Sequence, residues 1–188
     1  MRISSGVSGV LTVLVVGTAW GCQQPATGDR AAADRRVKAG YSRETGYLEQ
    51  LTVERDTGSI EARAYMQGAQ FKRIELDTNG DGQTDRWEYY AAGESPAGAA
   101  PSGGPPNPIL RAEQATRFNG TVSRWEYYEA GVIARVEEDV SDDGRIDKWE
   151  RYAGGELAAV ELDLSERGRP DRRLVFRADG STEVIDLP

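Results

Sequence analysis

Glycines recur along this chain at an interval that leaves room for little besides short strands. From about residue 41 onward, one glycine in each unit, here called the loop glycine, is found at Gly58, Gly82, Gly120, Gly144 and Gly168. A second glycine follows eleven residues later at Gly93, Gly131 and Gly155. Two such turns in a 24-residue unit leave two segments of about six residues, which suit a strand but not a stable helix. The repeat therefore predicts β-hairpins.

One interval between loop glycines is longer than the others. The spacings are 24, 38, 24 and 24 residues, so the second exceeds the repeat by 14. The surplus lies in residues 93–108, which are rich in proline and glycine. Such a composition is typical of a flexible insertion. We therefore expect residues 93–108 to enlarge one turn without interrupting the repeat.

A block of charged and aromatic residues follows each loop glycine. Its copies are Asp85-Arg-Trp-Glu-Tyr-Tyr90, Ser123-Arg-Trp-Glu-Tyr-Tyr128 and Asp147-Lys-Trp-Glu-Arg-Tyr152. Tryptophan and tyrosine favour strands, and the apolar residues before the loops alternate with period 2, as in Val160 and Leu162. We predict an all-β fold: a repetitive antiparallel meander of about five 24-residue hairpins spanning residues 41–188, in a sheet that twists or partly closes. The pattern alone does not decide which face the tryptophans occupy.

The N-terminus has the features of a secretory signal. Arg2 is followed by an apolar run over residues 10–16, too short to span a bilayer, and then by Gly21 and Cys22. A small residue before the single cysteine resembles a bacterial lipobox. That resemblance implies a signal peptide over residues 1–21, acylation of Cys22, and a flexible tether over residues 22–40. An unmodified thiol after an ordinary signal peptide is the alternative.

The same resemblance gives an expected location. Gln23 after the cysteine resembles lipoproteins that are sent to an outer membrane, so we expect a lipid-anchored protein of the bacterial cell envelope. Its leaflet and orientation stay open. The lone cysteine excludes a disulfide within the chain.

Composition disfavours several functions. The chain has 31 acidic and 23 basic residues, a net charge of -8, which disfavours nucleic acid as a partner. It has no histidine, the commonest general base and transition-metal ligand. No pair of carboxylates stands out from the repeat as a catalytic pair. We therefore predict a protein that is not an enzyme.

Two stretches have oxygen-bearing side chains at the spacing of a calcium loop. They read Asp77-Thr-Asn-Gly-Asp-Gly-Gln-Thr-Asp-Arg-Trp-Glu88 and Asp139-Val-Ser-Asp-Asp-Gly-Arg-Ile-Asp-Lys-Trp-Glu150. Oxygen donors stand at positions 1, 3, 5, 9 and 12, with glycine at position 6, and Ca²⁺ takes six to eight oxygen ligands. Both stretches resemble the EF-hand loop. The alternative is that Asp, Asn and Gly simply make good turns.

The resemblance implies two ligand sets and one or two bound Ca²⁺ ions. In the first loop the ligands would be Asp77, Asn79, Asp81, Asp85 and Glu88, with the carbonyl of Gln83. In the second they would be Asp139, Ser141, Asp143, Asp147 and Glu150, with the carbonyl of Arg145. The glutamates at position 12 would point away from the ion if they lie in strands. A third stretch, from Asp163 to Asp171, resembles a decayed copy in which the cation of Arg167 takes the place of the metal.

The flanks of the loops favour strands over helices. An EF-hand needs a helix on each side, and a dockerin-like module needs one after the loop, yet Gly154 and Gly155 follow Glu150 closely. The loops therefore most resemble those joining strands in integrin-type propeller blades, set in an array similar to MORN-type hairpin repeats.

The tryptophans suggest a further possibility. Trp87, Trp125 and Trp149 occupy equivalent positions, and alternate strands lie roughly 9.5 Å apart. The indoles could form a platform for a glycan or peptide, or simply pack across strands. We expect a calcium-braced, lipid-anchored module with a structural, adhesive or binding role. A glycan- or peptide-binding module and a dockerin-like docking module are the alternatives, and the partner, a protein or a glycan, stays unidentified.

Overall fold

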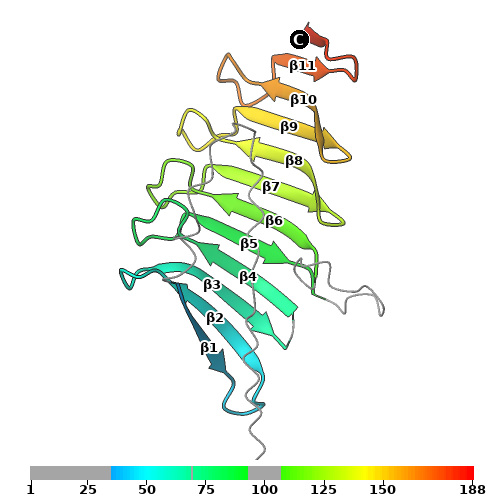
Figure 1. Ribbon diagram of the computed structural model, residues 1–188. Helices are drawn as coiled ribbons and strands as arrows, with labels where there is room; N and C mark the ends of the chain where they lie inside the picture. Colours follow the sequence, from blue (N-terminus) through cyan, green and yellow to red (C-terminus); the bar gives the residue numbers. More distant parts are fainter. Residues whose placement is uncertain (1–34, 69, 93–106) are drawn as a thin grey trace, which may run out of the picture.

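The chain forms one antiparallel sheet of twelve strands in sequence order. A computed structural model describes residues 35–68, 70–92 and 107–188, and these ranges contain no helix (Figure 1). The strands are β1 (Arg36–Tyr41), β2 (Leu48–Glu54), β3 (Ile60–Gln67), β4 (Gln70–Leu76), β5 (Arg86–Tyr90), β6 (Ile109–Gln114), β7 (Arg124–Glu129), β8 (Val132–Glu138), β9 (Lys148–Ala153), β10 (Glu156–Leu162), β11 (Arg172–Phe176) and β12 (Thr182–Asp186). The predicted all-β antiparallel meander is confirmed.

The sheet is open and one layer thick. Strands β1 and β12 are its two edges, and each strand contacts only its neighbours in the sheet. The partial closure that the sequence left possible does not occur. Strand β1 begins at Arg36, so residues 36–40 of the expected tether belong to the sheet. Cys22, the expected signal peptide and residues 93–106 of the insertion lie outside the described residues. No helix long and apolar enough to cross a membrane is found in the described ranges.

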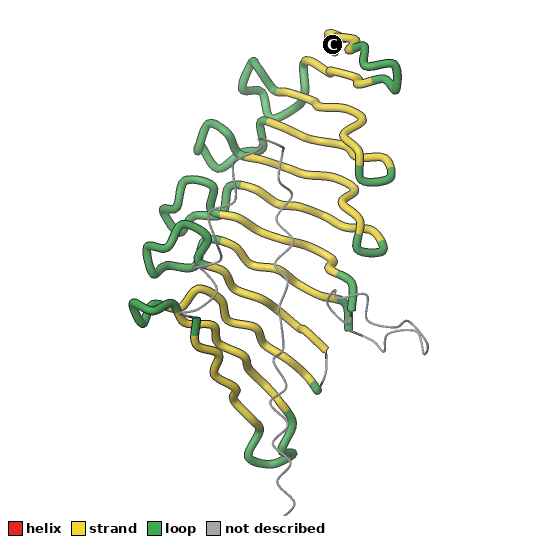
Figure 2. Tube along the Cα trace, viewed as in Figure 1, coloured by secondary structure: helices red, strands yellow, loops and turns green. Residues whose placement is uncertain are grey.

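The loops before β5, β7, β9 and β11 and the tight turns before β4, β8 and β10 lie on opposite sides of the sheet. Figure 2 shows the loops that precede β5, β7, β9 and β11 stacked along one side, while the shorter turns line the other. Two loop glycines, Gly82 and Gly144, have φ angles of 90° and 86°, in the left-handed region that favours glycine. The loop glycines therefore mark the side of the sheet on which the ends of β4, β6, β8 and β10 lie.

A β-bulge recurs next to the tight turns. The pairing register shifts between Tyr127 and Tyr128, where Ile133 and Arg135 of β8 are their partners, so Ala134 is the extra residue. Equivalent shifts occur between β3 and β4, β5 and β6, and β9 and β10. Because one residue is extra, Ile133 and Val136 lie on the same face although they are three apart. The bulge therefore explains apolar spacings that do not follow strict alternation.

The register separates the side chains into two faces. The Trp face carries a row that alternates glutamate and tryptophan across successive strands: Glu75, Trp87, Glu113, Trp125, Glu137, Trp149 and Glu161. The opposite Arg124 face carries the row Ile74, Glu88, Ala112, Glu126, Val136, Glu150 and Val160. Buried Ala64, Ala112 and Val136 lie on this second face. The apolar core is therefore small, and ion pairs and hydrogen bonds take a large share of the packing.

One side chain ties the described end of the insertion to the sheet. Asn107 is 3% exposed. Its Oδ1 accepts a hydrogen bond from Phe71 N at 3.0 Å, and its Nδ2 donates to Phe71 O at 2.7 Å and to Ala91 O at 2.6 Å. The two ends of the insertion therefore meet at β4, so the repeat continues past it.

Candidate functional site: the loops and the Trp face

The four long loops share one backbone conformation. At loop position 4 every copy has a positive φ: 85° at Gly80, 54° at Phe118, 68° at Asp142 and 55° at Glu166. The loop over residues 115–123 lacks carboxylates at the ligand positions, yet it has this conformation too. The shape of the loop is therefore a property of the hairpin repeat, and it does not require a complete ligand set.

Positions 1 and 9 of each loop extend the ladder of the sheet. Asp147 N donates to Glu138 O at 3.0 Å, and Asp163 N donates to Asp147 O at 2.8 Å. The aspartates at position 1 are buried, as at Asp139, which is 6% exposed, and so is Asp85 at position 9, which is 2% exposed, whereas Asp147 and Asp171 at position 9 are half-buried. Burial leaves the buried carboxylates dependent on hydrogen bonds and ion pairs from the protein.

In the first loop Asp77 already has a cation as its partner. Its Oδ2 accepts from Arg55 Nη1 at 2.7 Å and from Gly82 N at 2.9 Å, and its Oδ1 accepts from Gly80 N at 2.6 Å. Burial raises the pKa of Asp77, but the hydrogen bonds from Gly82, Gly80 and Arg55 outweigh it and hold the pKa below its usual value. Arg55 comes from the preceding turn, and the motif did not reveal it.

The other expected ligands of the first loop are bonded to one another or to the backbone. Asp85 accepts from Thr78 N at 2.8 Å through Oδ2 and from Thr78 Oγ1 at 2.6 Å through Oδ1. Asn79 Nδ2 donates to Asp81 Oδ2 at 3.0 Å, and Gln83 N donates to Asp81 Oδ1 at 2.7 Å. With Arg55 on Asp77 and Thr78 on Asp85, both oxygens of each of these buried carboxylates are in use.

The second loop leaves more of its oxygens without a partner. Asp139 accepts from the N–H groups of Asp142, Asp143 and Gly144 at 2.6, 3.3 and 2.9 Å. Asp147 uses only Oδ2, which accepts from Val140 N at 3.0 Å and from Ser141 N at 2.7 Å.

The oxygens left over are those that a cation would need. Asp143 accepts from Arg145 N at 2.8 Å through Oδ1. Within the described part of the chain, Asp147 Oδ1, Asp143 Oδ2 and Ser141 Oγ take part in no hydrogen bond or ion pair. Among the described residues no guanidinium contacts Asp139 in the way that Arg55 contacts Asp77, and Arg117 pairs instead with Asp142 at 2.8 Å. The donor set of the second loop therefore fits Ca²⁺ better than that of the first. No group of three or more carboxylates in the described ranges is arranged so closely that it would hold a metal as it stands.

The glutamates at position 12 lie in strands and bond along the sheet. Glu88 of β5 accepts from Arg86 Nε at 2.9 Å and from Tyr90 Oη at 2.8 Å. Glu150 of β9 accepts from Tyr152 Oη at 2.8 Å and pairs with Lys148 at 2.6 Å. The segments that a dockerin-like module would need as helices are thus strands β5 and β9.

The decayed third loop uses its arginine within the loop. Asp163 Oδ2 accepts from Gly168 N at 2.5 Å, and Arg167 Nε donates to Ser165 Oγ at 2.7 Å. Arg167 therefore bonds the side chain at position 3, and backbone N–H groups hold the aspartate at position 1.

A unit of one tyrosine, one arginine and one glutamate occurs three times on the Trp face, and a tryptophan from the strand of the tyrosine lies opposite the glutamate in the second and third copies. In its third copy Arg135 stacks on Tyr127 with 3.9 Å between the guanidinium carbon and the ring centroid, and it pairs with Glu137 at 2.7 Å. Tyr127 Oη donates to Glu137 at 3.2 Å, and Trp125 lies across from Glu137 in the register. Tyr65, Arg73 and Glu75, and Tyr89, Arg111 and Glu113, repeat the arrangement. In the sequence this arrangement corresponds to the Arg-x-Glu triplets at residues 73–75, 111–113 and 135–137, whereas the triplets at 86–88 and 124–126 lie on the opposite face, so the triplet alone does not reveal the unit.

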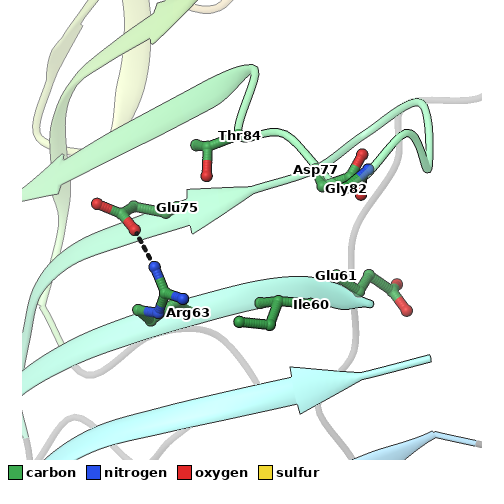
Figure 3. A pocket seen from close by; sticks show the side chains of 7 residues that line it. All are labelled: Ile60, Glu61, Arg63, Glu75, Asp77, Gly82 and Thr84. Carbon is green, nitrogen blue, oxygen red and sulfur yellow. Dashed lines mark hydrogen bonds and ion pairs between the residues drawn. The ribbon is translucent and has the colours of Figure 1, made fainter. Parts of the chain in front are cut away.

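A small hollow lies next to the first loop. Figure 3 shows its lining residues, and its volume is about 120 Å³. It is lined by Ile60, Glu61, Arg63, Glu75, Asp77, Gly82 and Thr84. Each of its three carboxylates carries an arginine: Glu61 pairs with Arg35, Glu75 with Arg63 and Arg73, and Asp77 with Arg55. The carboxylates of the hollow therefore belong to the ion pairs of the sheet.

Comparisons with known proteins give no family for the chain. No family model matches the sequence, and no curated protein does. Among solved structures, the accessory secretory protein 1, 2 and 3 assembly of Streptococcus pneumoniae contains a chain that is similar over 77% of this protein at 17% identity, with a TM-score of 0.32. This protein spans 22% of that chain.

Proposed function

We propose that this protein is a non-enzymatic β-repeat module, tied to the bacterial cell envelope through a lipid on Cys22, that holds a rigid sheet face toward a partner. The observation that carries the proposal is the three-fold repeat of Tyr, Arg and Glu, with the glutamates in the same row as the tryptophans, on a face that no other described element covers. Stacking and ion pairing fix these side chains, so a partner would meet a surface whose rotamer entropy is already lost. A structural or adhesive role uses such a surface directly.

Calcium bracing of the second loop belongs to the same proposal. Ser141 Oγ, Asp143 Oδ2 and Asp147 Oδ1 offer hard oxygens without a competing protein partner, whereas Arg55 neutralises Asp77 in the first loop. One Ca²⁺ per chain is therefore the proposed stoichiometry, held by the loop over residues 139–147. Extracellular calcium modules bind with dissociation constants of about 10⁻⁴ to 10⁻³ M, which suits a brace.

Chelation is expected to lower the melting temperature of the full chain, and Ser141→Ala is expected to remove most of that response. The Ser141 hydroxyl makes no hydrogen bond within the described structure, so its loss should leave the stability in EGTA unchanged. Thermal melts by circular dichroism, with millimolar CaCl₂ or with EGTA, measure both effects. Asn79→Ala in the first loop is the matched control and should keep the full calcium response. Equal melting temperatures with Ca²⁺ and EGTA would end the calcium proposal.

A second candidate function is glycan binding by the indoles. Trp87, Trp125 and Trp149 are half-buried and lie on alternate strands, so about 9.5 Å separates successive indoles. The apolar faces of pyranose rings stack on such side chains, and the glutamates between them can accept hydrogen bonds from sugar hydroxyls. This arrangement favours an extended β-linked polysaccharide over a compact ligand.

Binding of a soluble β-1,4-linked N-acetylglucosamine oligosaccharide is expected to quench tryptophan fluorescence and to weaken at least tenfold in Trp125→Ala. Trp125 is the central member of the row, so its loss removes a stacking partner worth about 1–2 kcal/mol. Tyr128→Phe, on the Arg124 face, is the control and should bind normally. Binding that survives Trp125→Ala unchanged would reject the platform and leave the indoles a packing role.

A further inference from the structure

The two edges of the sheet carry opposite charges, and no strand within the described residues pairs with their outer sides. Strand β1 holds Arg36 and Lys38 with no acidic residue, and β12 holds Glu183 and Asp186 with no basic residue. Lys38 and Asp186 each pair with a neighbour in their own sheet, yet their side chains stay 66% and 78% exposed. The charges are thus accessible to a strand that approaches either edge.

Both edges also expose apolar side chains. Val37 of β1 is 63% exposed and Val184 of β12 is 60% exposed. Exposed valines on an unpaired edge are a liability that soluble sheets usually avoid. Pairing β12 of one copy with β1 of another would bury Val184 of the first copy and Val37 of the second.

Alternate residues of β12 direct their backbone N–H and C=O groups away from β11, toward the open side of the sheet. Leu187 N donates to Asp171 O, so at this strand the odd-numbered residues face β11. Because the direction alternates in an antiparallel strand, the N–H and C=O groups of Thr182, Val184 and Asp186 face the open side. A further antiparallel strand can therefore add to β12.

The rows of the sheet predict the register of that addition. One row runs from Ala39 in β1 through every strand to Val184 in β12, and the adjacent row runs from Val37 to Asp186. If β1 of a second copy continues the meander, Ala39 stands opposite Val184 and Val37 opposite Asp186. Lys38 then lies diagonal to Glu183 on the Trp face, within reach of an ion pair.

We propose that copies of this chain assemble head to tail, with β12 of one copy paired antiparallel to β1 of the next. Opposite edge charges favour this pairing over β1 with β1 or β12 with β12, both of which would oppose like charges. The contact is heterologous, so each copy leaves one edge free and the assembly is an extended sheet. In such an assembly the Trp faces of successive copies would form one continuous surface.

Disulfide trapping between single-cysteine chains tests the contact and its register. The full chain is prepared as Cys22→Ser, so that no acyl chain adds to association, and carries either Ala39→Cys or Val184→Cys; a mass tag on one chain identifies the products. Opposed residues in an antiparallel pair have Cα atoms about 5.5 Å apart, which a disulfide can span. On mixing and oxidation, the Ala39→Cys–Val184→Cys heterodimer is expected to exceed both homodimers at least tenfold.

Two controls make the result decisive. Gly40→Cys, one residue away on the other face, should trap at least tenfold less with Val184→Cys. Arg36→Glu with Lys38→Glu should abolish trapping, and a partner carrying Glu183→Lys with Asp186→Lys should restore it, while circular dichroism shows that every variant keeps the strand spectrum. Homodimers as the main product, equal trapping by Gly40→Cys, or no trapped product would each overturn the proposal.

Discussion

Arg124→Met is expected to lower the free energy of unfolding by about 3 kcal/mol, because it leaves several carboxylates without their shared cation. Arg124 lies at the centre of the Arg124 face with its side chain 19% exposed. It contacts Glu126 at 3.1 Å, Glu138 at 3.0 Å and Glu150 at 3.3 Å. Methionine keeps most of the apolar volume, so the loss reports the charge. Urea denaturation at neutral pH measures it.

The acid dependence of this effect has a definite sign. Burial opposes ionisation of Glu126, but hydrogen bonds from Arg86, Tyr128 and Arg124 outweigh it and hold the pKa below the usual 4.5. A carboxyl with a lowered pKa in the folded state stabilises the protein above its unfolded pKa, and this contribution is lost as the pH falls through the folded pKa. The difference in the free energy of unfolding between the wild type and Arg124→Met should therefore become smaller below about pH 4.

A matched arginine on the other face provides the control for Arg124. Arg135→Met removes one ion pair and one tyrosine contact from a side chain that is 51% exposed. Exposed pairs contribute little, so a loss below about 1 kcal/mol is expected. Equal losses for the two variants would show that the Arg124 network contributes no more than a surface pair.

Asp139→Ala is expected to cost about 3 kcal/mol even without calcium, since it removes the acceptor for three backbone N–H groups. These donors belong to Asp142, Asp143 and Gly144, and Asp139 itself is 6% exposed. Without the carboxylate, the loop loses the hydrogen bonds that hold its left-handed residues. Denaturation in EGTA isolates this loss from any metal effect.

Asparagine at the same position separates hydrogen bonding from charge. Asp139→Asn keeps one acceptor oxygen, so it should recover part of the stability that alanine loses. Ser141→Ala, in the same loop, is the control and should not change the unfolding free energy in EGTA. If Asp139→Ala were as stable as the wild type, the loop would owe its shape to its backbone alone, as the loop over residues 115–123 already suggests.

The sequence was most informative about where the hairpins lie and least informative about which side chains of different hairpins contact one another. The spacing of the loop glycines predicted the meander, because Gly82 and Gly144 take backbone angles that other residues avoid. The calcium motif includes Asp77 and Asp139, which are buried, but it gave no sign of Arg55, which bonds Asp77 from 22 residues away. A local pattern cannot reveal such a contact, since it depends on which loops are neighbours in the sheet.

The sequence alone determined the all-β class, the strand lengths and the positions of the loops, because these follow from local backbone preferences and side-chain periodicity. Only the tertiary structure decided that Trp87, Trp125 and Trp149 share a face with Glu113 and Glu137, and that Arg124 lies among glutamates from three strands. The physical reason is register. A single extra residue at each bulge reverses which side chains face together, and that choice is made by pairing between strands.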